Sequence, residues 1–435
     1  MSGLRRELGL FSATLLVVGG IIGSGIFFTP AETARALPSA SWVLAVWALG
    51  GVVAFAGALT YAELGAMLPD AGGGYVYIRE AFGRLPAFLC GWMTLLLIAS
   101  GAIAAVAMGF AGYLEVFVPL DLFGGRLGVA AVTIMMLTAT NYLGVKPGTI
   151  TANVFTIAKI GALAALIVLG VLRSPPMPPV SGSSVPLTPP LVTGFATAFV
   201  AVLFTIGGWQ QTNMVAGEIR DPARNIPRAL MIGIAIVIAV YLGTTTTYLR
   251  TLGRDGLGAS NAPAADTMRM LIGPAGVRFI VAAAMLSIFG FVNVALLTNA
   301  RLLYALGQDG AFLPAAGRAH PRFGSPHVAL MMLGGWSLVL LFATRGAIGT
   351  LLSGVVFADW IFFGLGAASV FVLRRTRPAM LRPYRVLGYP WMPGFFVLCA
   401  VVGVVSAYLS QLRMSLVGTM MLGAGVLVYR WRREA

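Results

Sequence analysis

The most informative property of this chain is how few charged residues it has. Of its 435 residues only 10% are Asp, Glu, Lys or Arg, whereas a soluble domain has about 25%. Hydrophobic residues make up 58% of the chain, and the mean hydropathy is +0.90. This composition excludes an ordinary soluble protein and predicts an integral membrane protein that lies in a lipid bilayer.

Cysteine and histidine are equally scarce. The two cysteines, Cys90 and Cys399, lie in apolar runs, so no disulfide framework is predicted. The two histidines, His320 and His327, have no metal-ligand spacing, and the phosphate-binding pattern GxxxxGK[ST] is absent. Because no nucleophile-and-base constellation is visible either, we expect no metal, no cofactor, no ATP-driven transport and no enzymatic activity.

The formal net charge of +15 raises the question of whether the protein binds nucleic acid. The basic residues, however, lie in short loops between apolar runs and form no continuous basic face, so we expect no nucleic-acid partner. In membrane proteins such loop charges mark topology, and Lys and Arg fall on the side of the termini about twice as often as on the other side. This bias predicts cytoplasmic termini in a multi-pass protein of the cell (inner or plasma) membrane.

Apolar runs of about 20 residues, the length that crosses a bilayer as a helix, recur along the whole chain. A Pro- and Ser-rich linker at 173–190 separates the first five runs from the others. The sequence predicts twelve transmembrane helices at 8–37, 41–67, 86–118, 127–143, 149–172, 191–215, 228–250, 276–306, 327–344, 348–373, 391–409 and 413–430.

The first span contains a run of glycines, GGIIGSG at 19–25. An unbroken helix over 8–37 would be about 45 Å long, against a hydrocarbon core of about 30 Å. The sixth span has a similar interruption, TIGGWQQ at 205–211. Because these spans open two groups of five, the pair predicts an inverted repeat with discontinuous helices 1 and 6. A glycine seam for helix packing is the alternative for the first interruption taken alone.

A broken helix leaves backbone groups without their helical partners. Free N–H groups near Ser24 and Gly25 suit a carboxylate. Free carbonyls near Gly20 and Ile21, with a second set near Phe204 and Thr205, suit an ammonium group. An α-amino acid carries both groups a few Å apart, so the two interruptions predict an amino-acid-like ligand.

Four motifs in this order resemble one known family. They are IIGSGIF at 21–27 with the following TP, YAELGAMLPDAGGGYVY at 61–77, GGWQQTNMVAGEIRDPARNIPRA at 207–229 and NARLLYALGQDG at 299–310. Over nearly its whole length the chain resembles the amino acid–polyamine–organocation (APC) superfamily, closest to the L-type amino acid transporters and their bacterial relatives.

The resemblance implies an all-α integral membrane protein with the LeuT-type five-plus-five inverted repeat, two additional C-terminal helices and alternating access. The expected parts are the first repeat at 1–172, an extracellular or periplasmic linker at 173–190, the second repeat at 191–373, and two helices with a cytoplasmic end at 374–435.

The resemblance also implies a set of substrate contacts by position. The carboxylate would meet the amides of Ser24, Gly25 and Ile26, and the ammonium the carbonyls of Ile21, Phe204 and Gly207. Phe204 matches an aromatic residue that closes over the substrate, although a simple apolar lining role is the alternative. The full expected substrate-binding set is Ile21, Ser24, Gly25, Ile26, Phe204, Thr205, Gly207, Gln210, Asp359 and Trp360.

Lys159 lies in the middle of the fifth span, about ten residues from either end. A buried ammonium in a membrane is costly, so a function is the first expectation. The resemblance implies that this lysine occupies the volume of a sodium ion and contacts carbonyls near Gly19 and Gly20. We therefore expect a sodium-independent protein, in which either proton coupling or obligatory exchange remains open.

Asp359 lies deep in the tenth span, where L-type relatives often have asparagine. It could select a cationic group, carry a proton, pair with another polar residue or lie in water at the outer mouth. Ser100, Ser287 and Asn293 are further candidates for the pocket, and Glu63 is expected to be structural. Charged residues after the sixth span, Glu218, Arg220, Asp221 and Arg224, are expected to form an inner gate or loop clasp.

We therefore expect a sodium-independent secondary transporter, an exchanger of small or medium neutral L-amino acids. The alternatives are a cationic amino acid or polyamine transporter and a proton-coupled amino acid symporter. A channel or a transport-dead sensor is a hypothesis from another functional class. Animal relatives pair with a helper glycoprotein through a cysteine after the third span. Residues 114–126 contain no cysteine, so no covalent helper subunit is expected.

Overall fold

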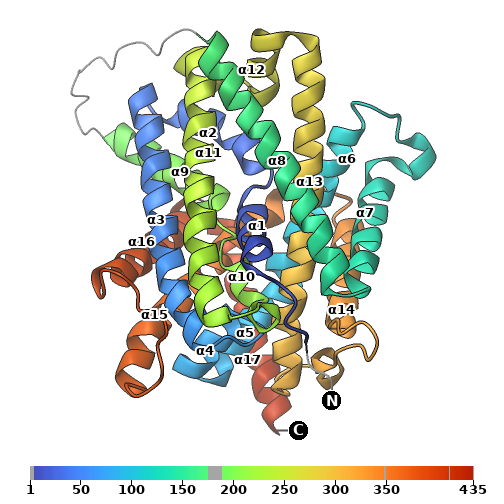
Figure 1. Cartoon of the computed structure of the whole chain (residues 1–435), viewed down its shortest axis with the longest axis vertical. Coiled ribbons are helices and arrows are strands. Elements are labelled where there is room, and N and C mark those ends of the chain that lie inside the picture. The colour runs from blue at the N-terminus through green and yellow to red at the C-terminus, as the bar shows by residue number, and fades with distance from the viewer. Residues whose placement is uncertain (1–3, 175–188, 347–348, 411, 435) are drawn as a thin grey trace.

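The computed structural model describes residues 4–174, 189–346, 349–410 and 412–434. These residues form a single assembly of helices in which no β-strand occurs (Figure 1). Most of the linker at 173–190, and the first residue of the span at 348–373, lie outside the described residues. Both ends of the chain lie at the same end of the molecule, which we call the terminal end (Figure 1).

The helices overlap the predicted spans, although some bounds differ, most of all at 228–250, where the helix covers Pro222–Ala259. In the first half they are α1 Leu10–Ile21, α2 Thr29–Ala36, α3 Ala40–Met67, α4 Gly74–Phe82, α5 Arg84–Met93, α6 Ala99–Leu114, α7 Gly125–Tyr142 and α8 Val145–Arg173. In the second half they are α9 Pro189–Thr205, α10 Gln211–Met214, α11 Pro222–Ala259, α12 Pro263–Ile272, α13 Pro274–Gln308, α14 His327–Ala343, α15 Gly349–Thr376, α16 Trp391–Ser410 and α17 Leu412–Glu434. Short 3₁₀ turns occur at Gly25–Phe27, Asp121–Phe123, Ala216–Glu218 and Pro314–Gly317, and a π-helical turn at Thr94–Ile98 joins α5 to α6.

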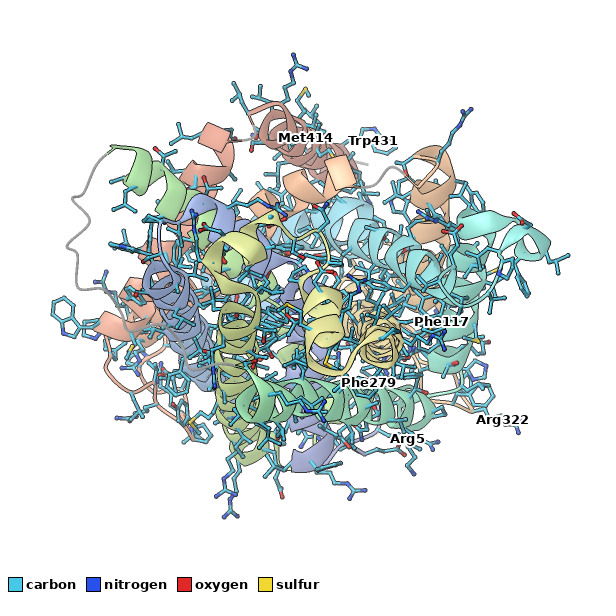
Figure 2. The ribbon with its side chains drawn as sticks, turned by 90° about the horizontal axis from the view of Figure 1, so that it is seen from above. Arg5, Phe117, Phe279, Arg322, Met414 and Trp431 are labelled. Atoms are coloured by element: carbon cyan, nitrogen blue, oxygen red, sulfur yellow. The ribbon has the colours of Figure 1, made fainter. Side chains whose placement is uncertain are left out.

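Seven helical segments among the described residues are long and apolar enough to cross a bilayer. They are Ala40–Met67, Arg84–Leu114, Val145–Arg173, Pro222–Ala259, Pro274–Gln308, Trp391–Leu409 and Leu412–Arg432. Large apolar side chains are exposed on the outer helices, and Met414 and Trp431 of α17 lie at the edge of the assembly seen from above (Figure 2). The chain is therefore a multi-pass membrane protein, while the count of twelve spans stays a prediction.

Two short helices were not predicted. α4 and α12 have nine and ten residues, which is too short to span a bilayer. A search for apolar runs of about 20 residues misses such elements because their apolar residues cover only one face. Gly72 and Gly73, with φ of 112° and 51°, make the turn that starts α4.

The first span is interrupted at its glycine run, as predicted. α1 ends at Ile21, a 3₁₀ turn follows at Gly25–Phe27, and α2 begins at Thr29. The helical structure after the interruption thus begins at Gly25 with Ser24 as its N-cap, and the α-helix itself begins about one turn later. Ser24 and Gly25 accept the 3.0 Å hydrogen bonds that close the 3₁₀ turn, and Pro30 occupies the first turn of α2, where its missing N–H costs no helical bond.

Buried charges are paired at the terminal end. The Arg301 guanidinium of α13 donates to both carboxylate oxygens of Glu218, at 2.8 and 3.1 Å, and both side chains are fully buried. The Glu218 carbonyl accepts from the amides of Glu7 and Leu8, at 2.9 Å each. Glu63 has the structural role expected of it, because it accepts from Arg374 at 2.6 and 2.9 Å and from the Val386 amide at 2.7 Å.

We predict that Glu218→Gln lowers the free energy of unfolding by about 3–5 kcal/mol, because it leaves the buried Arg301 charge uncompensated. The matched control is Glu115→Gln, which removes an exposed ion pair with Arg126 (side chains 57% and 43% exposed for Arg126 and Glu115). It should cost no more than about 1 kcal/mol. Denaturant unfolding in mixed micelles measures both values, and equal effects would contradict the structural assignment.

Candidate functional site

The two helix interruptions face each other in the middle of the molecule. α1 ends at Ile21 and α9 ends at Thr205, so each leaves a non-helical stretch before its next segment. Gly208 has φ +107°, and a Cβ atom placed there would lie 2.1 Å from the Gly20 carbonyl oxygen. Only glycine fits at Gly208, because any other residue would be excluded both by conformation and by contact.

The Tyr241 hydroxyl of α11 connects the two half-helix ends. It donates toward the Ile21 carbonyl at 3.1 Å and toward the Thr205 carbonyl at 3.3 Å. The hydroxyl groups of Thr29 and Thr205 lie 2.7 Å apart. These contacts give hydrogen-bond partners to groups that the interruptions free, which the interior of a membrane protein requires.

A cavity of about 230 Å³ opens at the interruptions. Its wall continues to Gly74 and Ile78 of α4 and to Met214 of α10, and α4 lies toward the terminal end of the molecule (Figure 1). The Phe204 side chain, 49% exposed, also lines it. The cavity therefore extends from the two half-helix ends to α4.

Most of the predicted contact residues line this cavity. Those that do are Gly20, Ile21, Ser24, Gly25, Phe204, Thr205, Gly207, Gln210, Asp359 and Trp360. The Ile26 side chain does not, since it is fully buried in the hydrophobic core. The expectation for Ile26 concerned its amide, which the burial of its side chain does not test.

The free backbone donors lie in the first interruption. Among the described residues, the N–H groups of Ser24, Gly25 and Ile26 donate to no protein acceptor. A Cβ at Gly25 would lie 2.7 Å from a methyl group of Thr205, so glycine lets this donor run approach the second interruption. Three adjacent unpaired donors form a group that can bind an anion.

The free acceptors lie in the second interruption. The Ile21 carbonyl already accepts from Tyr241 and, at 2.9 Å, from the Gly23 amide, which fills both of its lone pairs. The expectation that it meets an ammonium group is therefore corrected. The Phe204 carbonyl accepts only a long bond of 3.4 Å from the Gly207 amide, and the Gly207 carbonyl accepts none among the described residues.

Lys159 of α8 is buried and bonds to the first interruption. Its Nζ lies 3.0 Å from the Gly19 carbonyl and 2.5 Å from the Ile22 carbonyl. The predicted contact with Gly19 is confirmed, but Ile22 rather than Gly20 supplies the second carbonyl. The Ser287 hydroxyl also reaches Ile22 and the neighbouring carbonyl of Gly23, at 3.2 Å each. No carboxylate pairs with Lys159 among the described residues.

Three further pocket candidates have structural roles instead. Ser287 supports the first interruption, as described above. The Asn293 amide donates to the Gly148 carbonyl at 2.8 Å and accepts from Asn141 at 2.8 Å. The Ser100 hydroxyl donates to the Leu95 carbonyl at 2.6 Å, within the π-helical turn. None of the three lines the cavity.

Several cavity residues were missed by sequence reasoning. They include Tyr61, Cys90, Thr94, Gln211 and Asn299, and Tyr241 was missed as the link between the interruptions. A usable signal existed for Tyr241 and Tyr61: a tyrosine inside an apolar span needs a partner for its hydroxyl. No comparable signal indicates Thr94, because its place on the wall depends on the π-helical turn.

Comparison with known proteins matches this chain to one protein family. The family model described as amino acid permease matches residues 8–429. The rat large neutral amino acids transporter small subunit 2 is 34% identical over 397 residues, which cover 88% of this chain and 73% of that protein.

Two other relatives agree with this result. The human b(0,+)-type amino acid transporter 1 is 32% identical over 391 residues (88% of this chain, 79% of the relative). The mouse Asc-type amino acid transporter 1 is 34% identical over 393 residues (88% of this chain, 73% of the relative). The rat protein is named a small subunit, so the comparisons do not support the expectation that the chain has no helper.

We predict that Tyr241→Phe lowers the free energy of unfolding by about 1–3 kcal/mol, since two buried carbonyls lose a donor. Tyr248→Phe on the same helix is the matched control. Its side chain is also fully buried, but its hydroxyl has no hydrogen-bond partner among the described residues. Thermal unfolding in detergent compares the two, and an equal or larger loss in Tyr248→Phe would refute the role of Tyr241.

Proposed function

This chain belongs to the amino acid permease family, and from that premise we propose that it is a sodium-independent exchanger of small and medium neutral L-amino acids. The observation that carries the proposal is the pair of facing helix interruptions. One offers three unpaired N–H groups and the other offers free carbonyls, and both border the same cavity.

The proposed recognition of the amino acid head uses backbone atoms. Its carboxylate binds the N–H groups of Ser24, Gly25 and Ile26, and its ammonium binds the carbonyls of Phe204 and Gly207. These groups exist in every amino acid, so they recognise the class rather than one member. Apolar side chains such as Phe204 and Trp360 then favour small or medium neutral side chains.

Sodium independence rests on Lys159. Its ammonium lies against the carbonyls of Gly19 and Ile22, where a bound sodium ion would otherwise find oxygen ligands. We propose that this fixed cation holds the first interruption together in every transport cycle. A charge that is supplied by the protein needs no sodium gradient, which is consistent with exchange.

The topology belongs to the same proposal. Segments 1–172 and 191–373 are taken as two inverted repeats of five spans, with two further spans in 374–435 and twelve in all. The termini are placed in the cytoplasm of a cell that holds the protein in its inner or plasma membrane. Transport by alternating access is part of the same proposal.

We also propose that no covalent helper subunit is needed. Residues 114–126 contain no cysteine, and the side chains of Cys90 and Cys399 are buried. Neither thiol is therefore placed to form a disulfide bond with another chain. Non-reducing electrophoresis of the purified protein tests this directly, because a covalent partner would give a larger species that disappears on reduction.

The function is tested by counterflow in proteoliposomes. Vesicles loaded with a neutral amino acid should accumulate the labelled form from outside, and replacing sodium by choline should leave the rate within about twofold. A channel or a transport-dead sensor gives no counterflow. Sodium-dependent uptake, or no response to any of the twenty amino acids, would overturn the proposal.

We predict that Lys159→Ala reduces counterflow at least about 100-fold or makes it depend on an added cation, because the carbonyls of Gly19 and Ile22 lose their donor. Lys146→Ala is the matched control, since Lys146 is the other lysine of the chain and is 68% exposed in a 3.5 Å ion pair with Glu7. It should retain wild-type counterflow. Unchanged transport and cation dependence in Lys159→Ala would refute the role of this lysine.

A further inference from the structure

The cavity contains one charged side chain among the described residues, the carboxylate of Asp359. On α15, Asp359, Phe362 and Phe363 stand three and four residues apart and therefore share one face of the helix. All three line the cavity. The carboxylate thus belongs to the same space as the two interruptions, but it comes from a different element.

Asp359 has no partner within the protein. Neither a hydrogen bond nor an ion pair joins it to any described residue, whereas the other acidic groups inside the helix assembly, Glu63 and Glu218, each pair with an arginine. Its side chain is partly exposed, so it keeps contact with the cavity. An unpaired carboxylate at this depth is costly, and it is relieved when a ligand brings a positive donor.

Two hydroxyl groups on the cavity wall are already engaged. The Tyr61 hydroxyl donates to the Phe363 carbonyl at 3.3 Å, and the Thr94 hydroxyl donates to the Cys90 carbonyl at 2.7 Å. Neither hydrogen is available to the carboxylate without breaking a bond to the backbone. These two hydroxyl groups therefore do not satisfy Asp359, whose carboxylate lines the cavity.

The charge of the head group does not satisfy this carboxylate. On the proposed function, which this inference rests on, the α-ammonium binds the backbone carbonyls of Phe204 and Gly207. An additional cation has to come from the side chain of the amino acid. When a neutral side chain is bound, the partly exposed carboxylate retains water instead.

We propose that Asp359 is a specificity-determining residue, by which this site takes α-amino acids whose side chain ends in an ammonium group as well as neutral ones. The side-chain ammonium donates to the Asp359 carboxylate in a charge-assisted hydrogen bond, which is stronger than a bond between neutral groups. A diamine without a carboxylate binds weakly, because it leaves the N–H groups of the first interruption unpaired.

The experiment measures competition against counterflow of a labelled neutral amino acid. Competitors are isosteric pairs that differ by ammonium against methyl: 2,4-diaminobutyrate with norvaline, ornithine with norleucine, and lysine with 2-aminoheptanoate. In the wild type at least one cationic member should compete as well as its isostere or better. Putrescine should not compete, and equal competition by putrescine would show a polyamine site and overturn the proposal.

Asp359→Asn is the decisive variant. It should weaken competition by the cationic member of the preferred pair by about 10- to 100-fold relative to its isostere. Competition by norvaline should change by less than about threefold. Asp255→Asn, which neutralises a carboxylate that is 89% exposed, should leave the ratio unchanged. Should Asp359→Asn not fold, Asp359→Glu carries the test: it keeps the charge, so the cationic preference must persist and move to a shorter side chain.

The outcomes separate this inference from the function on which it rests. If the wild type shows no counterflow of any amino acid, the proposed function is wrong. If it exchanges neutral amino acids but rejects all cationic members, or if Asp359→Asn weakens both members of each pair equally, only the role of Asp359 is wrong. If Asp359→Asn abolished a pH dependence of counterflow but left the ratio of cationic to isosteric competition unchanged, Asp359 would be a proton carrier. That result would also overturn the proposal.

Discussion

Everything in this structure depends on how backbone groups that leave a helix are satisfied inside a membrane. No water is available in the hydrocarbon core, so each free N–H or carbonyl must find a partner in the protein or in a ligand. Tyr241 binds the ends of α1 and α9, Lys159 binds the carbonyls of Gly19 and Ile22, and Ser287 binds the carbonyl that follows. Of the groups that these partners leave unpaired, those of Ser24, Gly25, Phe204 and Gly207 border the cavity.

The groups that border the cavity fall into two sets, backbone atoms and side chains. Donors from the first interruption and acceptors from the second form a receptor of backbone atoms, suited to the two charges of an amino acid head. Side chains from several helices, among them Phe204 of α9 and Asp359 of α15, form the rest of the wall, and on the proposed function they face the variable part of the substrate. The glycines make this possible, because Gly20 and Gly208 bring two backbones closer than any side chain would allow.

Much of this arrangement could be predicted from the sequence, because the signals are local. Long apolar runs give the spans, and the glycine run at 19–25 gives the first interruption. An unusual charge in a span marks Lys159, whose contact with Gly19 is present. The two bonds that fill the Ile21 carbonyl and the start of α2 at Thr29 could not be predicted. They depend on a 3₁₀ turn and on the approach of α11, which are properties of the packed molecule.

The central claim is that the backbone of two helix interruptions recognises the common head of amino acids. Competition by head-blocked analogues tests it most directly. Against counterflow of a labelled neutral amino acid, its methyl ester and its N-acetyl derivative should each compete at least about 100-fold more weakly than the free amino acid, because each leaves one set of backbone groups unpaired. If both derivatives competed within about threefold of the free amino acid, backbone recognition of the head would be contradicted.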